Sequence, residues 1–370
     1  MRSRGSVLLA VPIAAGLLVG CDAKMPIAPS LEPAVASAAK GGIRSASTFA
    51  ARTTLPTLSR NVSGEAYAVD QAGSIVAGYS WDRAGRMNPV TWTLLNGTWT
   101  IAALPYSATA TSAVARAVND QGDVAGNDFP ASTPHAVLWP HTGGFNLLGC
   151  GELGEVYGLS AAGRIAVGIG RGASPATAAV WEPGSCRVDL PPLVAGGGAT
   201  ASAVNGDGTI VGGSAAPDAP STFNVPVRWR RVAGAWQIDL LDARAGSVRG
   251  ANSLGDLVGT VEVSCASASS CSRGVIWYAA GGSRELGTLG GESTTPRGIN
   301  AVGEVVGLST LPNGDGTAFF WSETLGMRQL PVNGGAWAFA VSGVRPDGTR
   351  LVVGAGGKPA APLAWVVSNP

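Results

Sequence analysis

The chain of 370 residues contains 25 Lys and Arg against 24 Asp and Glu, which gives a formal net charge of +1. Without a global positive field, we expect no nucleic-acid partner and no electrostatic attraction to anionic membranes. The only two histidines, His135 and His141, lack the spacing of a metal site or a catalytic triad, so we expect no metal and no cofactor.

Residues 1–20 have the features of a targeting segment. Arg2 and Arg4 precede an apolar stretch that is too short to span a bilayer comfortably. The run Leu18-Val19-Gly20-Cys21 is similar to a bacterial lipobox, in which the cysteine thiol accepts a diacylglycerol. We therefore expect an exported lipoprotein that is anchored through Cys21 and has no other membrane contact. The alternative is an ordinary signal peptide with Cys21 incidental, and the leaflet, periplasmic or cell-surface, stays open.

Residues 21–52 follow as the lipidated cysteine and a segment rich in Ala, Ser and Pro with few large apolar residues. This composition is typical of a flexible tether. Residues 53–370 form the third region, and its organisation is repetitive.

Seven tryptophans recur through residues 53–370 at intervals of about 45 residues, a period typical of propellers and solenoids. Each repeat predicts four short strands. A turn with Asn, Asp or Ser and a following Gly joins the first two strands, because those side chains bond to nearby backbone and Gly adopts a positive φ. Four strands per repeat make one propeller blade. The tryptophans are Trp92, Trp139, Trp181, Trp229, Trp277, Trp321 and Trp365.

The two ends of the repeat region predict a closed ring. The last copy lacks a fourth strand, whereas Thr53-Thr54-Leu55-Pro56 before the first copy matches the fourth-strand pattern of Ala102-Ala103-Leu104-Pro105. Pairing the ends removes the open edge that a linear array leaves exposed. We therefore predict an all-β, seven-bladed β-propeller in which the N-terminal strand completes the last blade.

Three segments carry a resemblance to a known family: Glu285-Leu286-Gly287-Thr288-Leu289-Gly290-Gly291, the run from Gly298 to Gly307, and His135-Ala136-Val137-Leu138-Trp139. They resemble the extracellular HAF repeats, which are named for a His-Ala-Phe triplet. Only His135 reproduces the histidine, and Val137 replaces the Phe. The resemblance implies an exported repeat protein and assigns no activity.

Four cysteines lie outside the targeting segment, and export permits disulfides. Cys265 and Cys271 flank a short loop that a local bridge would shorten. A bridge between Cys150 and Cys186 would tie together the edges of the third blade. The alternative is four free, buried thiols.

One candidate binding surface is the face that carries the loops between second and third strands. These loops vary in length, and rigid scaffolds usually carry function on such loops. Trp81 and Arg83 in the first blade are the main candidates, because aromatic side chains on polar loops stack against sugars and peptide side chains. The alternative is that such aromatics cover the blade core. Further candidates on this face are Asp82, Arg86, Phe129, Phe223 and Trp337.

A second candidate surface lies on the first strands, three positions before each turn residue. The next position is always Ala or Gly, so we expect the larger side chains to approach the central channel. Three arginines there suit an anionic ligand; the alternative is that they pair with neighbouring blades. These seven positions, called the inner ring below, are Tyr67, Arg116, Tyr157, Ser202, Arg249, Arg297 and Phe339.

These features predict a monomeric binding or interaction module of the cell envelope. Its ligand, a glycan, a peptide or a protein partner, is not readable from the sequence. No catalytic set is visible, and the inner ring holds no pair of carboxylates at the separation that a glycosidase requires. Two alternatives remain: an exported propeller enzyme that hydrolyses or eliminates polysaccharide bonds, and a structural envelope protein without a ligand.

Overall fold

The structure of the protein is a computed structural model that describes residues 49–60, 62–130, 134–151, 153–162, 165–171, 175–265, 270–332 and 334–368. The chain divides into two compact units, Met1–Arg44 and Ser45–Pro370. The expected signal peptide, Cys21 and nearly all of the tether lie outside the described residues. Within the described ranges, no helix has the length and apolar character needed to cross a membrane.

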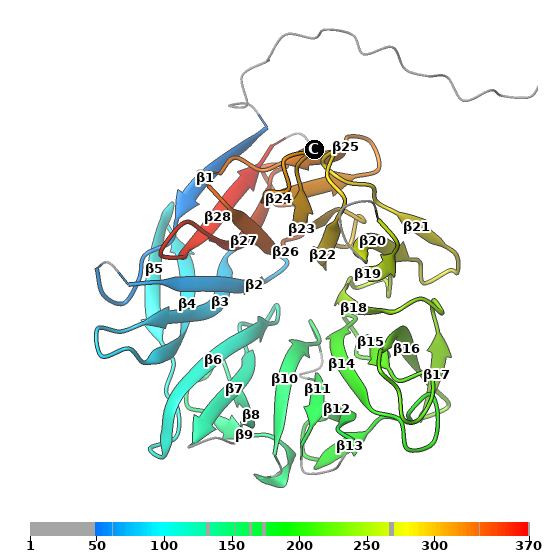
Figure 1. Cartoon of the computed structure of the whole chain (residues 1–370). Coiled ribbons are helices and arrows are strands. Elements are labelled where there is room, and N and C mark those ends of the chain that lie inside the picture. The colour runs from blue at the N-terminus through cyan, green and yellow to red at the C-terminus, as the bar shows by residue number, and fades with distance from the viewer. Residues whose placement is uncertain are drawn as a thin grey trace, which may run out of the picture. The chain divides into compact units, whose positions relative to one another are not determined.

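The second unit is a ring of seven antiparallel sheets of four strands each, and the first strand of every blade lies nearest the centre (Figure 1). The predicted seven-bladed β-propeller is confirmed. Blade 1 contains β2 (Gly64–Val69), β3 (Ile75–Trp81), β4 (Met87–Leu95) and β5 (Thr98–Ala103); blade 2 contains β6 (Ala110–Val118), β7 (Val124–Pro130), β8 (His135–Trp139) and β9 (Asn146–Leu147). Blade 3 contains β10 (Gly154–Leu159), β11 (Ala166–Gly170), β12 (Thr177–Trp181) and β13 (Arg187–Asp189); blade 4 contains β14 (Ala199–Val204), β15 (Ile210–Ala215), β16 (Val225–Val232) and β17 (Ala235–Leu240). Blade 5 contains β18 (Gly246–Ala251), β19 (Leu257–Val263), β20 (Cys271–Trp277) and β21 (Ser283–Glu285); blade 6 contains β22 (Thr294–Ile299), β23 (Val305–Thr310), β24 (Gly316–Ser322) and β25 (Gly326–Gln329). Blade 7 contains β26 (Ala336–Val341), β27 (Arg350–Gly356), β28 (Ala361–Val367) and β1 (Ala50–Thr54), and the short 3-10 helix η1 (Gly149–Gly151) lies between blades 2 and 3.

The hydrophobic cores lie between consecutive blades. Val306 and Phe320 of blade 6, for example, share a buried cluster with Val352 and Trp365 of blade 7. Each blade therefore buries both faces of its sheet against its neighbours, which is why the strands are short runs of Val, Ile and Ala between glycines.

The repeated tryptophans fix the contact between one blade and the preceding fourth strand. In four blades the indole N–H donates to the carbonyl oxygen of a proline that follows that strand. Because these indoles are almost completely buried, the bond satisfies a donor that has no access to water. The pairs are Trp92 with Pro56 (2.7 Å), Trp139 with Pro105 (2.5 Å), Trp229 with Pro191 (2.8 Å) and Trp365 with Pro331 (2.8 Å).

The turn between the first two strands works as the sequence predicts. In blade 6 the side-chain oxygen of Asn300 accepts hydrogen bonds from the backbone N–H groups of Val302 and Glu304 at 3.2 and 3.0 Å. Gly303 ends the turn with a φ of 80°. The amide of Asn300 also donates to the carbonyl of Ser342 in blade 7, so the same side chain joins two blades.

The segment before blade 1 pairs with the end of the chain. β1 is antiparallel to β28, with Arg52 opposite Trp365. After β1, Leu55 is 1% exposed and packs with Trp92 of blade 1 and Leu351 of blade 7.

Candidate functional site

The seven residues of the inner ring all occupy the same local structure. In every blade the pairing of the first two strands shifts by one residue, and the residue left out of the pairing is the inner-ring residue. The shift falls between Ala66 and Ala68 in blade 1, for example, which leaves Tyr67 as the additional residue of a β-bulge. A bulge redirects one side chain out of the regular alternation. The equivalent shifts surround Arg116, Tyr157, Ser202, Arg249, Arg297 and Phe339.

A glycine on the second strand makes each bulge possible. A Cβ atom at Gly78 would lie 2.0 Å from the carbonyl oxygen of Glu65, a distance at which two atoms cannot coexist. The same glycine recurs in every blade, at Gly126, Gly168, Gly213, Gly259, Gly307 and Gly354, always against the carbonyl two residues before the inner-ring position.

Five aromatic side chains connect the inner ring to the outer face of blade 1. Tyr67 contacts Phe339 of blade 7 with ring centroids 5.0 Å apart, and it contacts Tyr79 at 5.7 Å. Tyr79 continues to Trp81 at 6.2 Å, and Phe339 continues to Trp337 at 6.5 Å. All five side chains are partly exposed. This aromatic chain joins Trp81, predicted as part of the loop face, to Tyr67 and Phe339, predicted as part of the inner ring.

Two inner-ring arginines stack on this aromatic chain. The Cζ atom of Arg116 lies 4.6 Å from the ring centroid of Tyr67, and that of Arg297 lies 5.5 Å from Phe339. Such stacking holds a guanidinium in place through cation–π attraction. These two arginines do contact neighbouring blades, as the alternative in the sequence analysis expects. Their partners in those blades are aromatic rings.

Burial and nearby positive charge lower the pKa values of the arginines in blades 5 and 6. Burial lowers the pKa of Arg249, and the nearby charge of Arg297 lowers it further. The pKa of Arg297 is also lowered by burial; Tyr67 and Glu65 counteract this shift, and Arg116 adds to it. Arg297 therefore responds to residues of blades 1 and 2, which are not its neighbours in the ring. The inner-ring side chains converge near the axis.

Two glutamates near the inner ring were not predicted. Glu65 and Glu155 each lie two residues before a ring tyrosine. The hydroxyl of Tyr157 donates to Glu155 at 2.8 Å, and Arg171 pairs with the same carboxylate. Burial and then this bond raise the pKa of Tyr157 to about 12. Burial and then Glu65 raise the pKa of Tyr79 to about 12. The alternation of the first strand places these glutamates beside the ring, which a search restricted to one position per blade misses.

The other loop candidates do not join this site. Asp82 forms a local turn with the backbone and side chain of Arg86, and its pKa is lowered mainly by those hydrogen bonds. Arg83 is exposed next to this turn. Phe129 is partly buried, and Phe223 is 45% exposed in blade 4.

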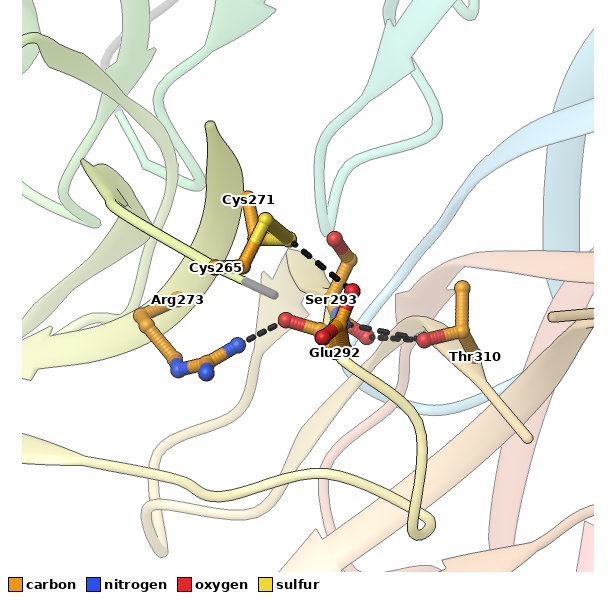
Figure 2. Close-up of a disulfide and its surroundings, with 6 residues drawn as sticks. All are labelled: Cys265, Cys271, Arg273, Glu292, Ser293 and Thr310. Carbon is orange, nitrogen blue, oxygen red and sulfur yellow. Dashed lines mark hydrogen bonds between the residues drawn. A yellow bond between two sulfur atoms is a disulfide. The ribbon is translucent and has the colours of Figure 1, made fainter. Parts of the chain in front are cut away.

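Both predicted disulfides are present. Cys150 is bonded to Cys186, which ties the start of blade 3 to its last strand, and Cys265 is bonded to Cys271. Figure 2 shows that the carboxylate of Glu292 points toward the second bridge, with Oε2 3.7 Å from the Sγ atom of Cys271. The three side chains lie close enough to hold a metal, but the bonded sulfurs are not thiolates. Two disulfides are typical of a protein that folds in an oxidising compartment outside the cytoplasm.

The histidines lie beside buried carboxylates in blade 2. His141 Nδ1 is 2.9 Å from Asp123, which also accepts the backbone N–H of His141. His135 Nδ1 is 3.4 Å from Asp128, whose side chain is fully buried. Both contacts lie within blade 2 and involve no inner-ring residue.

Comparison with solved structures places the chain among β-propellers. The β-propeller domain of the trilobed protease from Pyrococcus furiosus has a TM-score of 0.51 at 11% identity, over 84% of this chain and 94% of that one. A putative TolB from Agrobacterium tumefaciens gives 0.44 at 15% identity, over 77% and 100%. The sialidase of Trypanosoma rangeli gives 0.42 at 12% identity, over 86% and 59%. No family model matches the chain, and a comparison with curated proteins finds no match. The class that the sheet topology defines, in agreement with the first of these comparisons, is the seven-bladed β-propeller.

Proposed function

We propose that the protein is an exported binding module of the cell envelope and that its ligand binds across the inner ring and the aromatic chain. The observation that supports this most directly is the continuous row of partly exposed aromatic side chains from Trp81 to Trp337. Half-buried aromatics that retain exposed surface next to charged groups are the usual composition of a recognition site.

A catalytic role is the second candidate, because Glu65 and Glu155 lie beside the ring tyrosines. Arg171 and Tyr157 both engage the carboxylate of Glu155, and the raised tyrosine pKa values favour phenols that keep their protons. These features favour binding over proton transfer. Release of reducing ends or of unsaturated sugars from a polysaccharide panel, lost in Glu155→Gln, would instead establish an enzyme.

We also propose that Cys21 carries the lipid anchor and that the repeats belong to the HAF type. Acyl chains contribute about 0.8 kcal/mol per buried CH₂, so a lipidated cysteine holds a protein at a membrane firmly. Metabolic labelling with a fatty acid is expected to mark the protein and to fail in Cys21→Ser. Equal labelling of the variant would refute the anchor.

The pairing of β1 with β28 is, in this proposal, what closes the ring. Phe49 packs against Phe320 of blade 6 at 5.8 Å, β1 pairs within blade 7, and Pro56 accepts the indole N–H of Trp92 in blade 1. One segment thus contacts three blades. Deletion of residues 49–54 is expected to lower the melting temperature of the whole propeller, and an unchanged melting temperature would contradict the closure.

The binding proposal is tested with the purified full chain on arrays of glycans and peptides, followed by calorimetric titration of each hit. Trp81→Ala and Tyr79→Ala are expected to weaken binding at least tenfold, since an aromatic recognition residue contributes about 1–2 kcal/mol or more. Phe223→Ala is the matched control, because this exposed aromatic in blade 4 lies outside the aromatic chain. An equal loss of affinity in the control, or no loss of affinity in Trp81→Ala and Tyr79→Ala, would refute this binding site.

A further inference from the structure

Three arginines of the inner ring have no acidic partner. Among the described residues, no ion pair joins Arg116, Arg249 or Arg297 to a carboxylate. Arginines elsewhere in the propeller do have such partners, for example Arg350 with Glu304 at 2.7 Å. Positive charges that lie near one another without a counter-charge disfavour each other's charged state, so this set points to a ligand that supplies negative charge.

Two of these arginines, Arg116 and Arg297, stack on aromatic rings. A guanidinium that lies over an aromatic ring uses its face, whereas its N–H donors point outward in the guanidinium plane. The Nε atom of Arg116 is buried and has no hydrogen-bond partner. Buried donors are nearly always satisfied in folded proteins. Because this Nε atom is covered, a carboxylate that approaches in the guanidinium plane would pair with the terminal N–H groups of the guanidinium.

The charge of Arg297 also acts on Arg249. They occupy equivalent bulges in the neighbouring strands β18 and β22, and both side chains remain accessible to water. Each nevertheless has a pKa lowered by burial, and the charge of Arg297 adds to the shift at Arg249. Side chains that project into a water-filled space lined by protein meet both conditions. An anion bound between the two guanidinium groups would attract both of them and offset the repulsion between their charges.

The two glutamates near the ring do not replace such an anion. Glu155 is already engaged by Arg171 and by the hydroxyl of Tyr157. Glu65 interacts with the phenols of Tyr67 and Tyr79 and with the charge of Arg297. Neither glutamate forms an ion pair with Arg249 or Arg116 among the described residues.

We infer that the ligand is a glycan that carries a carboxylate, which Arg116, Arg249 and Arg297 bind while Tyr79, Trp81 and Trp337 contact the sugar rings. This inference rests on the proposed binding function and names its ligand class. A sugar ring offers an apolar C–H face and polar hydroxyl edges. Tyr79 and Trp81 are partly exposed and pack edge to face, and Tyr79 lies near the Glu65 carboxylate. Carboxylate and phenol groups are the acceptors and donors that sugar hydroxyls require.

The test uses pairs of ligands that differ only in charge. Oligosaccharides of galacturonate, glucuronate and N-acetylneuraminate are titrated calorimetrically into the purified full chain, each beside its methyl ester, and an oligoglutamate peptide serves as the competing anion. For at least one pair, the free acid is expected to bind roughly tenfold or more tightly than its ester, since hydrogen bonds to charged groups are strong. Arg249→Gln is expected to remove the difference between acid and ester, and Arg249→Lys to restore part of it. Trp81→Ala is expected to weaken acid and ester equally.

The outcomes separate this inference from the proposed function. Equal affinity for acid and ester overturns the acidic ligand but leaves a glycan-binding module. Binding of oligoglutamate alone overturns the glycan and keeps the anion site. Absence of binding across the panel overturns the inference, and it overturns the proposed function only if the wider glycan and peptide arrays are silent as well. A melting temperature that does not fall in Arg249→Gln would show that the arginine is not a structural residue, whereas a clear fall together with unchanged binding would overturn its role.

Discussion

The carbonyl oxygen of Ser247 lies 2.0 Å from the position that a Cβ atom would occupy at Gly259. This close approach lets the first strand of blade 5 take up one extra residue, which is Arg249. A glycine on the second strand thus determines where an arginine on the first strand points. The same relationship holds for Gly126 and Arg116 and for Gly307 and Arg297.

Replacing this glycine is expected to damage both stability and the site. Gly259→Ala should cost about 3 kcal/mol, because a methyl group forced into a packed backbone contact requires the strands to separate. Denaturant unfolding measures this loss. Gly335→Ala is the control, since its nearest neighbour atom would be 3.7 Å away, and a cost as large as that of Gly259→Ala would contradict the explanation.

The repeated tryptophans differ in what their indole N–H groups contact. Trp229 donates to Pro191, whereas the buried Nε1 atom of Trp181 has no partner. Trp229→Phe should therefore destabilise the protein more than Trp181→Phe, by about 1–3 kcal/mol, because only the first change leaves a buried carbonyl unsatisfied. Both changes remove similar volume, so the difference between their unfolding free energies isolates the bond. Equal losses would contradict its contribution.

The two disulfides should contribute unequally. The Cys150–Cys186 bridge spans 36 residues and the Cys265–Cys271 bridge spans 6. In the chain-entropy model, a longer closed loop restricts the unfolded chain more, which predicts contributions of about 4 and about 2 kcal/mol. Double Cys→Ser variants of each pair, compared by thermal unfolding, test the order. A larger loss on removing the shorter bridge would reverse the prediction.

Alkaline pH should destabilise the propeller through its ring tyrosines. Burial and Glu155 raise the pKa of Tyr157 from 10.0 to about 12. The folded state therefore keeps a proton that the unfolded state loses, so this contribution is complete below pH 10 and disappears as pH rises to about 12. Ultraviolet absorbance of phenolate and unfolding across this range should show a smaller loss in Tyr157→Phe. An identical loss in that variant would contradict the assignment.

The joint between the last and first blades depends on Leu55. This side chain is 1% exposed and lies in the core shared by blades 7 and 1. Leu55→Ala should cost about 2–5 kcal/mol, as for other large-to-small changes in a packed core. Leu95→Ala, at a site 57% exposed, should change stability by less than about 0.5 kcal/mol. Unfolding of both variants in denaturant provides the comparison.

Much of the candidate site could be predicted from the sequence by counting three residues back from each turn residue. Positions three residues before each turn identified Tyr67, Arg116 and Arg297 as one ring, because every blade repeats the same bulge. Glu65 and Glu155 were missed, since their position holds unrelated residues in the other blades and carries no repeated signal. The contact between Tyr79 and Trp81 was also hidden, because Tyr79 lies inside a strand and only its packing reveals the aromatic chain.

The sequence by itself determined the seven blades and their turns, because these depend on local chemistry repeated at a fixed period. It suggested both disulfide pairs and left free thiols as the alternative, which the structure decided. Leu-Pro places a carbonyl oxygen against the next tryptophan in four copies, and Asn, Asp or Ser followed by Gly forms the turn in the repeats. The tertiary structure decided which side chains meet near the axis. Arg116, Arg297 and Tyr67 come from three different blades, and their mutual influence depends on how the ring brings distant strands together. The repeat period specifies each blade, and only the arrangement of the blades around the axis specifies which side chains lie near one another there.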